Sequence, residues 1–249
     1  MAHPQIKRVN RRRRFSGFTL VELLVVITIV VILAALAFFM MRNAKTAAQS
    51  TVCISRLRNA GNLLLSAASD NGGRVQAFSG GSGGFDYRPY YVVARELGLS
   101  NDDNGKTALK AALEEVMFCP SAPAPDTEHW TCYGVNFTNS TRAGSTWTTE
   151  KITDTAGRIA NVKSLNLASV GSPSDYILIA DSCRSDGQQI FRISGGDRIG
   201  LRHSHKANAC FLDGSARHLT MSDLGRLGFK EAYDTASDPP QTVSLPQSP

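Results

Sequence analysis

The chain has 249 residues, with 27 Lys and Arg against 21 Asp and Glu and a formal charge of +6. Six of the basic residues lie before residue 18, where there is no acid, so the rest of the chain carries 21 of each sign and is neutral. A neutral net charge gives no support for nucleic-acid binding, and we expect no nucleic-acid partner.

Residues 18–41 are apolar except for Thr19, Glu22 and Thr28. As a helix rising about 1.5 Å per residue, this stretch is long enough to cross a hydrocarbon core of roughly 30 Å. The arginines at 11–14 precede it, which keeps the start of the chain in the cytoplasm and sends the remainder outward. A carboxylate such as Glu22 is costly in lipid and calls for a cationic partner, so it indicates a function. We predict a membrane-spanning helix here.

The sequence GFTLVE at residues 17–22 resembles the cleavage box of type IV prepilins and type II secretion pseudopilins. The resemblance implies that residues 1–17 are a leader, that a prepilin peptidase cuts after Gly17 and methylates Phe18, and that Glu22 acts in filament assembly. Helix geometry agrees, because Glu22 lies four residues beyond the new ammonium and at the positive end of the helix dipole. In a bundle of such helices, the carboxylate can pair with the ammonium of a neighbouring subunit.

Two other interpretations of this segment are open. An ordinary secretory signal has a basic start, a short apolar core and a small-x-small cut site, which Ala35-Leu36-Ala37 would supply. The apolar core is too long for that signal and continues through residues 38–41. An uncleaved signal anchor is the second possibility, in which Glu22 has no purpose. We favour the prepilin interpretation.

The apolar pattern predicts that the helix continues past Met41. Apolar residues recur at spacings of three and four, as expected for one helical face: Cys53, Leu57, Ala60, Leu64 and Ala67. We therefore predict one helix over about residues 18–69, with its outer half packed on the head and Cys53 as a small buried residue. Gly72 and Gly73 then supply the left-handed cap.

Beyond residue 130 the pattern is that of β-strands, with short β-branched or aromatic runs separated by turn residues. Asp213-Gly214 predicts a two-residue hairpin turn of type I′. The last stretch, 235–249, has four prolines and little to bury, which predicts disorder. The expected fold is α+β and pilin-like, with the long helix packed on an antiparallel sheet in a head covering residues 42–234.

Export to an oxidising compartment would permit disulfides among the five cysteines. Cys119 and Cys132 flank a proline-rich loop and are the first candidate pair. Cys183 and Cys210 are the second. Cys53 is left over.

A narrower resemblance extends through the head. Residues 203–214 read His, nine residues, Asp-Gly, and resemble the C-terminal box of prepilin-like proteins named for a His-x9-Asp-Gly motif. Three upstream segments are similar to other recurring words of that family, in the same order: FCP at 118–120, YGVN at 133–136 and ILIAD at 177–181. The resemblance covers nearly the whole mature chain.

The chemistry of this box has two interpretations. In the structural one, Asp213 and Gly214 form the turn and His203 hydrogen-bonds the carboxylate or a turn amide, fixing the hairpin to the sheet. In the other, His203 and His205 lie on one face of an extended segment and bind a metal. The residues that would complete the metal site are Asp213, Asp181 and His218. We favour the structural interpretation, and a Ser-His-Asp hydrolase comes third because no nucleophile context accompanies the histidines.

The two resemblances together imply a structural subunit of a type IV pilus-like or type II secretion pseudopilus filament, with no enzymatic activity and no cofactor. Its expected partners are the prepilin peptidase/methyltransferase, other pilin-like subunits and the bacterial inner membrane. It would cross that membrane once, with the head on the periplasmic side and the filament in the periplasm or at the cell surface. The alternative is a membrane-anchored cell-envelope enzyme or metal-binding protein that uses His203 and Asp213.

Overall fold

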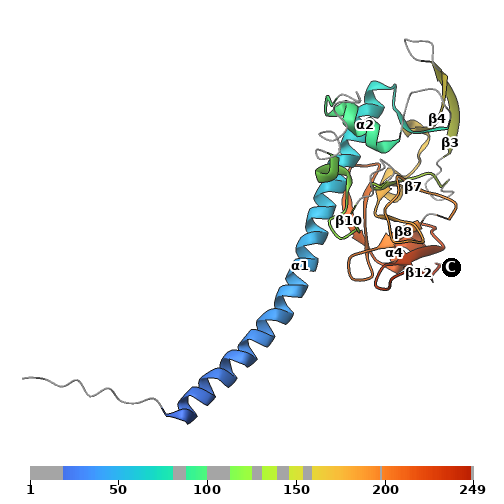
Figure 1. Cartoon of the computed structure of the whole chain (residues 1–249). Coiled ribbons are helices and arrows are strands. Elements are labelled where there is room, and N and C mark those ends of the chain that lie inside the picture. Colours follow the sequence, from blue (N-terminus) through green and yellow to red (C-terminus); the bar gives the residue numbers. More distant parts are fainter. Residues whose placement is uncertain are drawn as a thin grey trace, which may run out of the picture. The chain divides into compact units, whose positions relative to one another are not determined.

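The computed structural model describes residues 19–80, 88–99, 113–124, 131–138, 146–153, 159–196 and 198–247 (Figure 1). The chain divides into two compact units, residues 1–44 and 45–249. Helix α1, Leu20–Asp70, begins in the first unit and ends in the second. The predicted single helix over about residues 18–69 is therefore confirmed along its described length.

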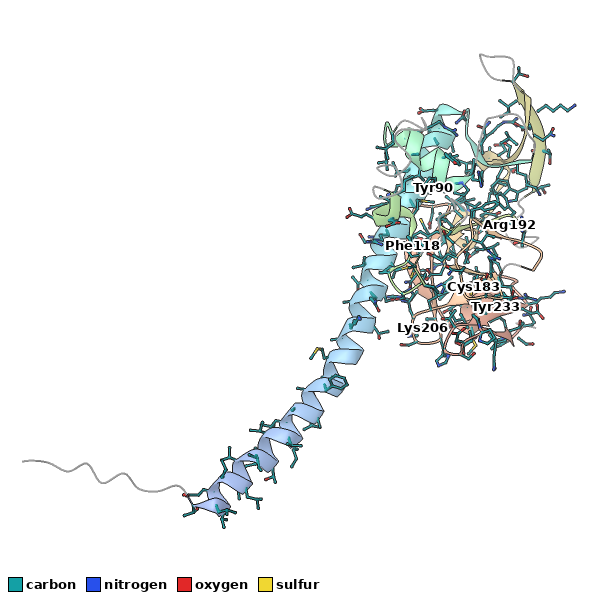
Figure 2. All side chains as sticks on the ribbon, in the orientation of Figure 1. Tyr90, Phe118, Cys183, Arg192, Lys206 and Tyr233 are labelled. Carbon is teal, nitrogen blue, oxygen red and sulfur yellow. The ribbon has the colours of Figure 1, made fainter. Side chains whose placement is uncertain are left out.

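In the first unit, α1 is apolar from Leu20 to Met41 apart from Glu22 and Thr28. The segment Leu20–Phe38 is long and apolar enough to cross a membrane, and none of it is buried within the chain. Its side chains project from the helix in every direction (Figure 2). A helix that is apolar all round needs an apolar environment outside its own chain, either lipid or other helices.

In the second unit, α1 lies against the head. The predicted apolar stripe is buried over its whole length: Cys53, Leu57, Ala60, Leu64 and Ala67. Gly72 and Gly73 have positive φ just after the last helical residue, as expected for a left-handed cap. The Gly73 N–H donates to the Ala68 carbonyl at 2.8 Å, which satisfies one of the carbonyls left free at the helix end.

The described part of the head contains three sheets. The first has the order β1-β4-β3, formed by β1 (Arg74–Gly80), β4 (Ile159–Asn166) and β3 (Trp147–Thr153). The second has the order β10-β9-β5-β2-β7, formed by β10 (Ala216–Leu219), β9 (Ala207–Phe211), β5 (Ile177–Ala180), β2 (Gly134–Asn136) and β7 (Arg192–Ile193). The third has the order β12-β11-β8-β6, formed by β12 (Gln241–Ser244), β11 (Glu231–Asp234), β8 (Arg198–Leu201) and β6 (Ser182–Cys183).

Strand pairing is mainly antiparallel, with two parallel pairs, β2 with β7 and β11 with β8. The arrangement is α+β and pilin-like, as expected, although its sheets are mixed. Short helices complete the head: α2 (Pro89–Glu96), residues 113–117, η1 (Leu167–Ser169), η2 (Pro173–Asp175) and α4 (Met221–Arg226).

The second sheet, which contains β9, has an apolar core on each of its two faces. Along β9, Ala207, Ala209 and Phe211 belong to one apolar core, whereas Cys210 belongs to the core that contains the α1 stripe. The first of these cores also includes residues from β8, α4 and β11: Ile199, Leu224 and Ala232. Because successive residues of a strand point to opposite faces, a strand between two cores is apolar throughout.

The predicted disorder of residues 235–249 is wrong for the described part of this segment. β11 and β12 pair as an antiparallel hairpin from Glu231↔Ser244 to Asp234↔Gln241. Leu245 is buried in the core that contains Phe211 and Leu224, and its N–H donates to the Lys230 carbonyl at 2.8 Å. The prolines lie in the connection and after the strand, where they interrupt no ladder hydrogen bond.

The turn between β9 and β10 also differs from the prediction. The Phe211 N–H donates to the Ser215 carbonyl at 2.8 Å, so the loop has three residues. Within this loop, only Gly214 has positive φ, at +80°. The Asp213 Oδ1 accepts the Ser215 N–H at 2.9 Å, which holds the turn locally. One positive-φ residue suits this longer loop, whereas a type I′ turn requires two.

Candidate functional site

The N-terminal motif starts α1 with a capping box. The Thr19 Oγ1 accepts the Glu22 N–H at 3.2 Å, and the Glu22 Oε2 accepts the N–H and O–H of Thr19 at 2.9 and 2.8 Å. Such a box satisfies donors that a helix start leaves free. Glu22 therefore has a local structural use. The predicted processing residues, Gly17 and Phe18, lie outside the described residues.

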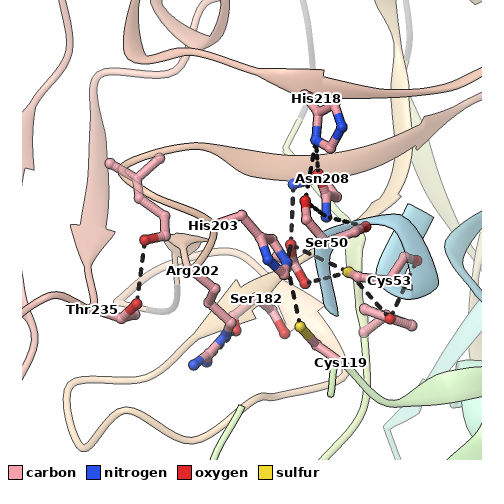
Figure 3. Close-up of polar contacts among 12 residues, drawn as sticks. Ser50, Cys53, Cys119, Ser182, Arg202, His203, Asn208, His218 and Thr235 are labelled. Atoms are coloured by element: carbon pink, nitrogen blue, oxygen red, sulfur yellow. Dashed lines mark hydrogen bonds and ion pairs between the residues drawn. The ribbon is translucent and has the colours of Figure 1, made fainter. Parts of the chain in front are cut away.

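Four side chains from separate parts of the head converge in its interior, and Figure 3 labels three of them, Cys53, Cys119 and His203. Cys53 comes from α1, Cys119 follows the helical residues 113–117, Asp181 joins β5 to β6, and His203 follows β8. All four are buried, and their sulfur, oxygen and nitrogen atoms lie within 4.8 Å of one another. We call these four residues the Cys-Asp-His cluster.

Direct contacts link the cluster into a chain. The His203 Nε2 lies 3.2 Å from the Asp181 Oδ2 and 3.4 Å from the Cys119 Sγ. The Cys53 Sγ lies 3.3 Å from the Asp181 Oδ1 and 3.6 Å from its Oδ2. Asp181 therefore stands between the two cysteine-bearing segments, with the imidazole on one side and the α1 thiol on the other.

Further donors and acceptors surround the cluster. The Tyr133 hydroxyl lies 3.2 Å from the Phe118 carbonyl and 3.3 Å from the Cys53 Sγ, and the Asn208 N–H donates to the Asp181 Oδ2 at 3.0 Å. The Gln189 Oε1 accepts the Cys119 N–H at 2.9 Å. These contacts hold the Cys53 and Asp181 side chains and the Cys119 backbone in place.

The backbone at Asp181 is held by two strands. The Asp181 N–H donates to the Asn208 carbonyl at 3.0 Å, and the Asp181 carbonyl accepts the Gly200 N–H at 2.9 Å. Asn208 belongs to β9 and Gly200 to β8, so Asp181 lies where the second and third sheets meet.

His203 is placed by a tight turn. His203 and Lys206 exchange backbone hydrogen bonds at 3.0 and 3.2 Å. The residues between them, Ser204 and His205, have φ of 53° and 60°. Positive φ at both central positions is the pattern of a type I′ turn. The structure therefore has this turn at Ser204-His205, whereas the sequence predicted it at Asp213-Gly214.

Burial and mutual contacts shift the pKa values within the cluster. Burial raises the pKa of the Cys53 thiol well above its usual value. The hydrogen bond with Cys53 lowers the pKa of Cys119, and His203 acts in the same direction. Burial alone would lower the pKa of His203, but its hydrogen bonds with Asp181 and Cys119 raise it to about 9. Cys119 is therefore the more acidic of the two thiols.

The structure brings together only some of the predicted residues of the box. His203 and Asp181 meet, but Asp213 bonds its own turn. The other two histidines lie elsewhere: His205 pairs with Asp234 at 2.8 Å on the surface, and the His218 Nδ1 contacts the Asn208 Oδ1 at 2.6 Å. The structural interpretation predicted a hydrogen bond from His203 to Asp213 or its turn. This contact is wrong, because His203 contacts Asp181 and Cys119 instead.

All five cysteines are free, so neither expected disulfide is present. The Cys119 Sγ faces His203, whereas the Cys132 Sγ donates to the Tyr133 carbonyl at 3.4 Å. Cys183 lies in β6 of the third sheet, and Cys210 lies in β9 on the face that packs against α1. The members of each predicted pair thus lie in different packing environments. Closeness in sequence, for Cys119 and Cys132, and position in strands, for Cys183 and Cys210, did not show this.

Cys53, Cys119 and Tyr133 were not predicted from the sequence as members of one site. A signal was present, because the four segments that resemble the His-x9-Asp-Gly family each contribute one residue here: Cys119, Tyr133, Asp181 and His203. Cys53 lies in none of these segments. Its place in the apolar stripe of α1 was explained by burial alone, so no role in a site was predicted for it.

Residues 12–38 match the family described as the prokaryotic N-terminal methylation motif. No curated protein and no solved structure matches the chain. The motif implies a prepilin-like protein that is processed by a prepilin peptidase. Together with the apolar helix, it indicates that the unprocessed chain is anchored in the inner membrane.

Proposed function

We propose that the chain is a structural subunit of a type IV pilus-like or type II secretion pseudopilus filament, cleaved after Gly17 and N-methylated at Phe18. The observation that carries the proposal is the methylation motif at residues 12–38. The resemblance of the head to the His-x9-Asp-Gly prepilin-like proteins supports the same role for the rest of the chain.

The exposed helix supports assembly. From Leu20 to Met41, α1 presents large apolar side chains that its own chain leaves uncovered. Lipid covers them before assembly. Helices of neighbouring subunits would cover them in a filament, where close packing gains dispersion contacts that a single span in lipid lacks. The capping contact with Thr19 leaves the Glu22 Oε1 for a second partner, and the ammonium of a neighbouring Phe18 suits it.

The remaining partners follow from this role. They are the prepilin peptidase/methyltransferase and other pilin-like subunits, with the head on the periplasmic side of the inner membrane. The protein performs no catalysis in this proposal. An envelope enzyme or metal-binding protein that uses His203 together with Asp213 has no support, because the two residues bond different partners.

Fractionation of native cells tests the filament role. Filaments are sheared or overproduced and recovered, and the chain is detected with an antibody against the head. We expect it in the filament fraction of wild-type cells, and at full precursor mass in the membranes of cells without the peptidase. A processed chain that stays in the membrane and cross-links to no pilin-like subunit would contradict the proposal.

A further inference from the structure

We propose that Cys53, Cys119, Asp181 and His203 form a closed tetrahedral site for a zinc ion, which fastens α1 to the head. The four side chains offer two thiolates, one carboxylate and one imidazole, all of which are ligand types that Zn²⁺ accepts. This role is independent of the filament proposal, since it concerns how the head holds together.

The distances fit such a site. With Zn–S bonds of about 2.3 Å and Zn–N and Zn–O bonds of about 2.0 to 2.2 Å, ligand atoms in a tetrahedron lie roughly 3.3 to 3.8 Å apart. The Asp181 Oδ2 lies 3.2 Å from the His203 Nε2 and 3.6 Å from the Cys53 Sγ, and the His203 Nε2 lies 3.4 Å from the Cys119 Sγ. The other separations do not exceed 4.8 Å. An ion at the centre would need only small side-chain movements.

The residue types favour a metal over a network of hydrogen bonds alone. A thiol is a weak donor and a weak acceptor, so two buried thiols are poor partners for a carboxylate and an imidazole. Hydroxyl groups would serve a hydrogen-bond network better. Thiolates, in contrast, bind zinc strongly and select it over magnesium and calcium, which prefer oxygen.

The charge of the occupied site is compensated by its surroundings. Two thiolates and a carboxylate around Zn²⁺ leave one net negative charge. The Tyr133 hydroxyl lies 3.3 Å from the Cys53 Sγ, close enough to donate to a thiolate there, and the Asn208 N–H already donates to the Asp181 Oδ2. Donors of this kind stabilise anionic ligands in a buried site. With the Nε2 on zinc, the His203 Nδ1 carries the ring proton, and it is buried with no hydrogen-bond partner among the described residues.

The position of the site indicates its purpose. Its ligands come from α1, from the segment after residues 113–117, from the β5–β6 junction and from the turn after β8. Four protein ligands in a buried position leave no open coordination site, which is the mark of a structural ion. The ion would therefore cross-link the long helix to both sheets that meet at Asp181.

Metal analysis of the full-length chain tests the proposal. The protein is purified in detergent from membranes without chelator, and its metal content is measured by mass spectrometry. We expect about one zinc per chain. Cys119→Ser and His203→Gln should lose nearly all of it, whereas Cys183→Ser, a matched change at a buried cysteine outside the cluster, should retain it. Zinc retained in full by Cys119→Ser and His203→Gln would overturn the assignment.

A second measurement on the unaltered chain guards against variants that fail to fold. A strong zinc chelator should lower the thermal unfolding temperature, and Zn²⁺ but not Mg²⁺ or Ca²⁺ should restore it. Tyr133→Phe should weaken zinc affinity by about 10-fold while keeping the site. Peptide mapping of the same sample decides between the remaining outcomes. A Cys53–Cys119 disulfide, or a metal-free chain with both thiols free, would each overturn the proposal.

Discussion

Glu22 has two chemical uses at the start of α1. Its carboxylate closes a capping box with Thr19, and the methylation motif that contains it indicates processing and assembly. A cap needs a hydrogen-bond acceptor three residues after the threonine, which glutamine also supplies. Pairing with an ammonium needs the negative charge. The two uses can therefore be separated by substitution.

Glu22→Gln should leave the chain cleaved and membrane-inserted but sharply reduce its recovery in filaments, because it keeps an acceptor for the cap and removes the charge. Thr19→Ala is the matched control, since it removes the capping hydroxyl and keeps the charge; its filament yield should stay close to that of the wild type. Quantitative immunoblots of sheared filaments compare the two. Wild-type filament recovery from Glu22→Gln, together with a loss in Thr19→Ala, would show that the cap, and not the charge, is what assembly requires.

For single residues, the sequence predicted a functional role only where the neighbouring residues in the chain made the residue unusual. Glu22 was found because a carboxylate in an apolar run has few explanations. His203 was identified as a site residue with the wrong partners, because Cys119 and Asp181 approach it only through the fold. Cys53 went unrecognised, because a small apolar residue on a buried helical face already has an explanation.

Among the elements, the contact between α1 and β9 organises the head. Gly61 lies on the face of α1 that meets this strand, and a Cβ there would stand 2.4 Å from the Cys210 Sγ. The missing side chain allows the helix and the strand to approach closely. This contact places Cys53, two turns earlier in α1, at the level of Asp181.

Gly61→Ala should destabilise the head by about 1 to 3 kcal/mol through overpacking, offset in part by a gain in helix propensity of about 1 kcal/mol. Thermal unfolding of the full-length protein in detergent measures the change. Cys210→Ala in the same chain removes the opposing sulfur and should recover part of the loss. Asn59→Ala on the exposed side of α1 is the control and should have little effect. A neutral Gly61→Ala would contradict the close approach of α1 and β9.

The C-terminal hairpin is the element that the sequence misjudged most. Leu245 is 5% exposed and packs into the core with residues of β8 and α4. Four prolines in a polar stretch predicted disorder, but a single buried leucine and a short strand pair with β11 suffice to order it.

Leu245→Ala should lower the unfolding free energy by about 2 to 5 kcal/mol, the usual range for emptying a buried leucine site. Thr242→Ala in the exposed part of β12 should stay within about 0.5 kcal/mol. Chemical denaturation, followed by tryptophan fluorescence, compares them. If Leu245→Ala proved as mild as Thr242→Ala, the hairpin would contribute nothing to the core.

For the whole molecule, periodicity and composition predicted the coarse design. The long helix, its apolar half and the α+β head follow from local patterns of apolar residues, which one sequence displays directly. The parallel pairs of β2 with β7 and β11 with β8 depend on contacts between distant segments. The same is true of the Cys-Asp-His cluster. Patterns within short windows carry no information on such contacts.

The central claim is that the chain is a processed prepilin-like subunit, and the mass of its mature form in native cells tests this most directly. Intact-mass spectrometry of protein from native membranes should give a chain that begins at Phe18 and carries one added methyl group. The same chain in cells without the prepilin peptidase should keep residues 1–17. A mature chain that begins at Phe38 would mean an ordinary secretory signal, which removes Glu22 and most of the apolar helix and contradicts the filament assignment.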